Sequence, residues 1–238
     1  GRVQVGLQMR YMPLYHKVHE LYSSGVIGPV RKIVADELRM DWFRHWPSDP
    51  EREKRENWRY FRAMSGGSIL EKLCHDLDIH SHVFGLVPQD VRAVGGRAVY
   101  ADRETIDNAT IHVSYTNKTA LTINFTLTSP YISARTHIYG TEGALTFDRT
   151  GTVIEQWNGH WPPRSKPDVV HDTNLDRKST LGYLGSAEGL ANLMAARRGT
   201  VPAWPTPRDA WLSMALSMAS THSVDEGGSR VQLSDEKY

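Results

Sequence analysis

The 238-residue sequence has a single cysteine, no long apolar run and almost no net charge. Because Cys74 has no second cysteine to pair with, no disulfide can form within the chain, which fits a reducing, cytoplasmic setting. No apolar stretch is long enough to span a membrane, and no signal peptide is visible. The formal net charge of +1, without basic runs that alternate with aromatics, argues against a nucleic-acid-binding surface.

The sequence also lacks a Gly-x-Gly-x-x-Gly turn after a strand and a phosphate-binding loop. Its length is enough for one large domain, or for one domain with an appendage. The first residue is not an initiator methionine, and Val3, Val5 and Leu7 alternate as in a strand, which predicts a strand over residues 2–8. We therefore expect the chain to be cut from a longer one.

The most informative segment that is present covers residues 66–84, where a Gly-Gly-Ser break leads into a helix predicted over 68–84. At roughly 100° per residue, one sector of this helix is apolar and the opposite side carries ionisable groups. The apolar sector includes Cys74, which we interpret as a small buried side chain rather than a nucleophile. The ionisable stripe consists of Glu71, His75, Asp78 and His82.

Within this stripe, Glu71 precedes His75 by about one turn of helix. A carboxylate in that position can orient an imidazole and stabilise its charged form, as a general acid/base requires. A solvated polar face, which any amphipathic helix shows, is the alternative interpretation. Lys72 lies roughly 100° further round the helix from Glu71, and we expect it to be structural.

The rest of the chain predicts an α+β fold with a largely antiparallel sheet. A helix follows Pro13 and stops at Gly25, a strand covers 30–40, and the segment 41–65 has no clear period but many aromatics, among them Trp58. Alternating apolar residues leave one sheet face buried and the other polar or covered by a partner. Further strands are predicted over 90–99, 107–116, 119–128, 132–140, 143–148, 152–157 and 230–233, and helices over 180–198 and 207–222, with 158–178 irregular.

Several landmarks together resemble the C-terminal part of the glucose–fructose oxidoreductase/inositol dehydrogenase (Gfo/Idh/MocA) family. They occur in the family's order over nearly the whole chain, which makes the combination specific although each motif alone is weak. They are the strand at 3–11, the Ser-Gly-Val-Ile-Gly-Pro-Val crossover at 24–30, the Gly-Gly and Glu-x-x-x-His-Asp-x-Asp helix at 66–78, the Gly-Thr-Glu-Gly-Ala-Leu hairpin at 140–145 and the closing segment at 202–211.

Members of this family are NAD(P)-dependent oxidoreductases that act mostly on sugars, inositols and related polyols, so the resemblance implies the same activity for the full-length enzyme. His75 matches the histidine that exchanges the substrate hydroxyl proton during hydride transfer. Glu71 takes the place of the usual aspartate, which keeps the charge but adds a methylene. His75 and Glu71 are therefore the expected catalytic pair.

The resemblance also implies substrate-binding residues on four segments. Asp78 lies one turn beyond the expected catalytic histidine and could support it. Glu37 and Arg39 share a strand face and resemble positions where relatives contact substrate hydroxyls, with a surface ion pair as the alternative. Arg10 and Trp58 complete the expected substrate-binding set.

The implied fold is that of a dihydrodipicolinate-reductase-like C-terminal domain, an open-faced sheet packed with helices on one face, without the N-terminal Rossmann domain. Residues 1–25 would be a remnant strand and helix of the dinucleotide-binding domain, and residues 26–238 the substrate-binding and oligomerisation domain. NAD or NADP would bind to the missing domain, so the cofactor-binding residues lie outside this chain and the fragment alone is expected to be inactive. Homodimers or homotetramers would form through the open sheet face.

Two other functions remain open at this stage. A metal-dependent lyase or isomerase could use Glu71, His75, Asp78 and His82, although ligands in one line on a helix make a poor cage, and we expect no metal. A non-catalytic sugar-binding or assembly module with the same fold is the second alternative.

Overall fold

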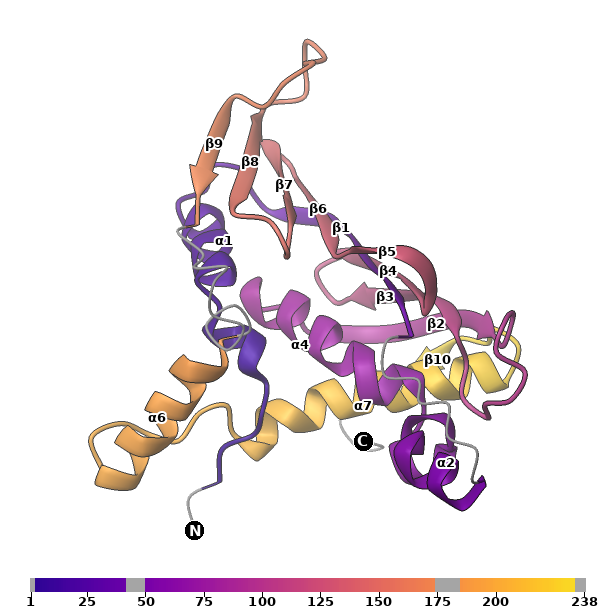
Figure 1. Ribbon diagram of the computed structural model, residues 1–238. Helices are drawn as coiled ribbons and strands as arrows, with labels where there is room; N and C mark the ends of the chain where they lie inside the picture. Colours follow the sequence, from indigo (N-terminus) through magenta and orange to yellow (C-terminus); the bar gives the residue numbers. More distant parts are fainter. Residues whose placement is uncertain (1–2, 42–49, 174–184, 234–238) are drawn as a thin grey trace.

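The computed structural model describes residues 3–41, 50–173 and 185–233 (Figure 1). The largest element is a ten-stranded sheet in the order β10-β2-β3-β4-β1-β6-β7-β8-β9, with β5 also paired to β1. Its strands are β1 (Val30–Met40), β2 (Pro88–Gly96), β3 (Asn108–Tyr115), β4 (Ala120–Thr126), β5 (Thr128–Ser133), β6 (Arg135–Gly140), β7 (Gly143–Asp148), β8 (Val153–Asn158), β9 (Val169–Asp172) and β10 (Val231–Gln232). β1 and β4 run parallel, and the other neighbouring pairs run antiparallel. The predicted α+β class with a largely antiparallel sheet is confirmed.

The helices lie on one side of this sheet, with α4 and α7 next to it and α2 and α6 further away (Figure 1). They are α1 (Pro13–Ser23), α2 (Pro50–Glu56), α3 (Arg62–Ser65), α4 (Cys74–Val83), α6 (Ser186–Arg198) and α7 (Pro207–Asp225), with short helical turns η1 (Gln8–Tyr11), η2 (Trp58–Tyr60) and η3 (Ile69–Leu73). Ile33 and Ile123 of the sheet are buried in one core with Leu77 of α4 and Leu216 of α7. Burying this apolar face is the main driving force that holds the two layers together.

None of the helices described in residues 3–41, 50–173 and 185–233 covers the opposite face of the sheet. Strand residues that alternate with the core residues, such as Lys32 and His112, are exposed there. Tyr139 is 44% exposed on the same face. The predicted open-faced sheet with helices on one side is therefore confirmed.

Two of the glycine motifs meet at one corner of the sheet. The N–H of Glu142, in the hairpin between β6 and β7, donates to the carbonyl of Ile27 at 2.9 Å. A Cβ on Gly140 would lie 2.0 Å from that same carbonyl oxygen, and Gly28 has a φ of +63°. Glycine is required at both positions because the two backbones touch and one turn is left-handed.

The predicted strand at 2–8 is wrong for the residues that the structure describes. Residues 3–7 have no regular structure, and η1 follows directly. The N–H of Val5 donates to the carbonyl of Pro205, in the loop before α7, at 2.9 Å. An alternating apolar pattern forms a strand only where a neighbouring strand supplies the ladder hydrogen bonds, and here a loop occupies that side.

Other boundaries differ where tertiary contacts decide them. The segment predicted as one strand over 132–140 is divided between the end of β5 and β6. Within β5, the register against β1 shifts between Leu38 and Met40. The segment 41–65 contains α2, η2 and α3, and β9 lies in the stretch expected to be irregular. The predicted helix over 68–84 begins with a π-helical turn, η3, before α4 continues as a regular α-helix. Residues 180–184 of the predicted helix at 180–198 lie outside the described residues.

Candidate functional site

His75 lies in the first turn of α4 and is partly buried. Its ring nitrogen Nδ1 is enclosed and has no hydrogen-bond partner among the described residues. Burial lowers the pKa of His75; the charge of Asp76 opposes this effect and that of Arg149 adds to it. The imidazole is therefore neutral near pH 7 and has a lone pair with which to accept a proton.

Glu71 lies in the π-helical turn η3 and is held by two cations. The Nε–H of Arg59 donates to Oε1 of Glu71 at 2.9 Å, and Nζ of Lys72 lies 3.3 Å from Oε2. No hydrogen bond joins Glu71 to His75 in the part of the chain that the structure describes; the carboxylate acts on His75 through its charge, which raises the histidine pKa. The wider turn of a π-helix changes the side-chain spacing that a regular α-helix would give.

A buried charge network lies behind His75 and joins the helix to the sheet. Arg149, just after β7, forms ion pairs with Asp76 at 2.7 Å and with Glu37 of β1. Glu37 also pairs with Arg39, so the two residues expected on one strand face do lie together. All these groups have less than a fifth of their side chains exposed. The network fixes the start of α4 against β1, because a buried charge is stable only with its partners in place.

Sequence reasoning missed Asp76 and Arg149. A signal for Asp76 was present, because a carboxylate that falls between the apolar positions Leu73 and Leu77 of a helix must be buried and needs a cation. Arg149 had no such signal, because it follows a strand and only the fold brings it to the helix.

Trp58 in η2 is linked to the charged groups at the start of α4 through its neighbour Arg59. The guanidinium carbon of Arg59 lies 4.4 Å from the centre of the Trp58 ring, and the same guanidinium binds Glu71. The residues expected at the site therefore fall into two groups. One group gathers at the start of α4: His75, Glu71, Trp58, Glu37 and Arg39.

Arg10 and Asp78 form the other group, in the second half of α4. Nε and Nη2 of Arg10 donate to the two carboxylate oxygens of Asp78 at 2.8 and 2.7 Å, and both side chains are only 4% exposed. Nη1 of Arg10 donates to Asp209 of α7 at 2.7 Å. Although burial alone would raise it, hydrogen bonds from Thr206 and Arg10 lower the pKa of Asp209 to about 2.

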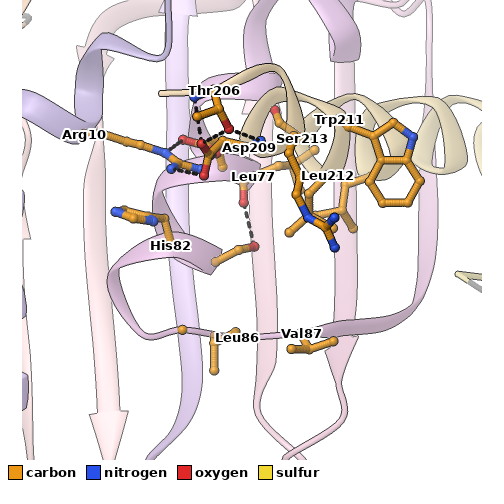
Figure 2. Close-up of a pocket in the computed structure, with 15 residues that line it drawn as sticks. Arg10, Leu77, His82, Leu86, Val87, Thr206, Asp209, Trp211, Leu212 and Ser213 are labelled. Atoms are coloured by element: carbon orange, nitrogen blue, oxygen red, sulfur yellow. Dashed lines mark hydrogen bonds and ion pairs between the residues drawn. The ribbon is translucent and has the colours of Figure 1, made fainter. Parts of the chain in front are cut away.

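These three charged groups line a cleft of about 980 Å³ between the second half of α4 and the first half of α7 (Figure 2). Figure 2 shows Arg10 and Asp209 pointing toward one another, with His82 on the side of Arg10 and Trp211 across the cleft. His75 and Glu71 do not line this cleft. The large cleft is therefore separate from the predicted acid–base pair. We place the candidate site at the start of α4, because the groups that could transfer a proton lie there.

Two further interpretations from the sequence concern the reactivity of Cys74 and a possible metal site. Burial raises the pKa of the Cys74 thiol to about 12, so this residue stays protonated and is a poor nucleophile. Within residues 3–41, 50–173 and 185–233, no three His, Cys, Asp or Glu side chains gather in a way that could hold a metal ion. None of the helices described there has both the length and the apolar character needed to cross a bilayer.

The sequence model of the GFO/IDH/MocA C-terminal domain matches residues 15–146, which is more than half of the chain. The chain therefore belongs to the GFO/IDH/MocA family, as the motifs predicted. Among curated protein sequences, none matches the chain.

Solved structures of oxidoreductases and dehydrogenases resemble the chain closely in fold. The WlbA dehydrogenase from Bordetella pertussis, in complex with NADH and UDP-GlcNAcA, has a TM-score of 0.78 and 19% identity, over 98% of this chain and 65% of that one. An oxidoreductase domain protein from Kribbella flavida has a TM-score of 0.80 and 18% identity, over 98% and 66%. A myo-inositol dehydrogenase, assigned as putative, from Sinorhizobium meliloti 1021 has a TM-score of 0.70 and 18% identity, over 97% and 65%. The chain spans less than two thirds of these structures, and identities this low establish the fold alone.

Proposed function

We propose that this chain forms the substrate side of an oxidoreductase that transfers hydride between a nicotinamide cofactor and a sugar, an inositol or a related polyol. The observation that carries the proposal is His75, a neutral and partly buried imidazole in a charged cluster. The bound NADH and UDP-GlcNAcA of WlbA, and the myo-inositol dehydrogenase assignment of the Sinorhizobium structure, support this cofactor and substrate class.

In the direction of oxidation, the substrate hydroxyl gives its proton to His75 while the hydrogen on the same carbon leaves as hydride, and a C=O bond forms. A nicotinamide cofactor, when bound, accepts the hydride. His75 can take the proton because burial keeps it neutral before the reaction. The charges of Glu71 and Asp76 raise the pKa of His75 and so stabilise the imidazolium that results.

The cofactor would be held largely by residues outside the described site. The enclosed Nδ1 of His75 has no partner among the described residues, which fits a site that a further group completes. No Gly-x-Gly-x-x-Gly turn is present in the sequence to hold a dinucleotide. We therefore propose that a dinucleotide-binding domain, to which residues 1–25 belong, completes the enzyme. Residues 26–238 would form the substrate-binding and oligomerisation domain, and this chain alone would have no turnover.

We also propose that copies of the chain associate through the open face of the sheet. Val94 is 58% exposed and Tyr139 is 44% exposed on this face, and apolar surface in water is costly. Light scattering in solution tests this proposal: a dimer or tetramer is expected, and a monodisperse monomer contradicts it.

The principal test is replacement of His75 by alanine in the full-length natural protein that contains this chain. We expect turnover of the best polyol, with NAD⁺ or NADP⁺, to fall by about 10²–10⁴-fold, because general acid/base catalysis contributes that much. The substrate is found first, by screening inositols and hexoses with both cofactors. Near-normal turnover in H75A, or no turnover of any polyol by the wild type, contradicts the proposed function.

A further inference from the structure

Lys72 occupies a different environment from the one that helix geometry predicts. An even spacing of 100° per residue would turn its side chain away from Glu71. The turn Ile69–Leu73 is π-helical instead, and Nζ of Lys72 lies 3.3 Å from Oε2 of Glu71. The Lys72 side chain is only 13% exposed. Single π-helical turns occur frequently at functional sites, and this one places a lysine beside the expected catalytic pair.

The charges that surround Lys72 come from three elements. Glu71 lies on the same turn, Arg39 on β1 and Arg59 on η2. Burial is the main cause that lowers the pKa of Lys72; Arg39 and Arg59 lower it further, and Glu71 opposes them. A lysine in such surroundings changes between ammonium and amine at a lower pH than an exposed lysine.

The neighbours of Lys72 include two residues that sequence analysis assigned to the site. Glu71 is its ion-pair partner, and Arg39 is close enough to affect its pKa. An ammonium has three N–H donors, so Lys72 can hold Glu71 and another oxygen at the same time. Burial of an ammonium costs free energy, which the ion pair with Glu71 offsets in part.

We propose that Lys72 binds a substrate oxygen adjacent to the carbon that is oxidised, and so selects polyols with a neighbouring hydroxyl. This inference rests on the proposed function, since it assumes that substrate lies against His75. Lys72 donates a hydrogen bond in its ammonium form and transfers no proton. Its contribution is to affinity and to the choice of substrate, whereas His75 contributes to the chemical step.

The test compares Lys72→Met and Lys72→Arg in the full-length protein, with the best polyol from the screen as the probe. We expect K72M to raise KM about 10–100-fold, because a hydrogen bond to a charged group is lost, with kcat changed much less. Binding of the same polyol without cofactor, measured by calorimetry, should weaken by a similar factor. K72R should keep most of the affinity, because a guanidinium also donates hydrogen bonds.

The pH dependence separates substrate binding from a structural role. In the wild type, KM should rise as pH rises through the lowered pKa of Lys72, because only the ammonium donates. In K72R this rise should be absent, since a guanidinium stays charged. Lys166→Met, in the exposed loop between β8 and β9, is the matched control and should leave KM, kcat and binding unchanged.

Two results would overturn the inference. One is a K72M protein with wild-type KM and polyol affinity, and the other is a K72R protein that shows the same rise of KM with pH as the wild type. If K72M does not fold, the K72R pH profile decides. H75A distinguishes the two proposals: it should lose turnover but keep polyol binding, and if it retains turnover the proposed function fails regardless of Lys72.

Discussion

The two halves of the helical segment 69–83 carry similar ionisable residues in very different surroundings. At the start, Glu71 is held by Arg59 and Lys72, and the nearby His75 has an enclosed nitrogen without a partner among the described residues. In the second half, Asp78 is locked in a two-fold hydrogen-bonded ion pair with Arg10, which Asp209 completes. In the first half His75 keeps a ring nitrogen without a partner among the described residues, whereas in the second half Arg10 binds both carboxylate oxygens of Asp78.

The difference shows that the role of a carboxylate depends on the groups that contact it in the folded protein. Glu71 and Asp78 lie on the same predicted stripe, yet Glu71 faces the charged cluster and Asp78 faces the N-terminal segment through Arg10. A buried carboxylate that is fully paired contributes to assembly, because breaking the pair leaves an uncompensated charge. We therefore propose that Asp78 and Arg10 hold α4 in place and that Glu71 serves the reaction.

Replacing Asp78 by asparagine should give the largest loss of stability. We expect the free energy of unfolding to fall by about 3–5 kcal/mol, because the buried guanidinium of Arg10 loses its main partner. Urea unfolding with linear extrapolation measures the change. Asp225→Asn is the control, since Asp225 pairs with Arg62 in an exposed position and should change stability by less than about 1 kcal/mol.

The contrast between the two halves would not hold if D78N were as stable as D225N. It would also fail if folded D78N lost turnover as completely as H75A, because Asp78 would then serve the reaction directly.

Replacing Glu71 by glutamine should have a smaller effect on stability and a larger one on turnover. Stability should fall by about 1 kcal/mol, because the amide keeps part of the hydrogen bonding to Arg59. The pKa of His75 should fall further, since the charge of Glu71 raises it, and turnover should decrease about tenfold. The pH dependence of turnover, recorded for wild type and E71Q, measures both effects; an unchanged profile would assign Glu71 a purely structural role.

Much of the fold followed from local patterns. The strands β3, β4, β7 and β8 lie within a residue or two of their predicted bounds, because apolar alternation and turn residues specify them locally. The strand at 2–8 failed, because its neighbour is a loop rather than another strand. The helix at 68–84 was predicted in extent but not in its first turn, since a regular spacing cannot anticipate a π-helical turn.

For the candidate site, sequence by itself determined the residue types. The histidine and its companion carboxylate can be recognised in one motif, because a helix brings residues three and four apart onto one side. The family is indicated by several motifs in their order along the chain. Only the tertiary structure decided the partners. It paired Glu71 with Arg59 and Lys72, Asp78 with Arg10, and it placed Arg149 behind His75. The pairs Arg10–Asp78 and Arg149–Asp76 join segments far apart in the chain. The geometry and desolvation of all these pairs depend on how the helices pack on the sheet, which no local pattern encodes.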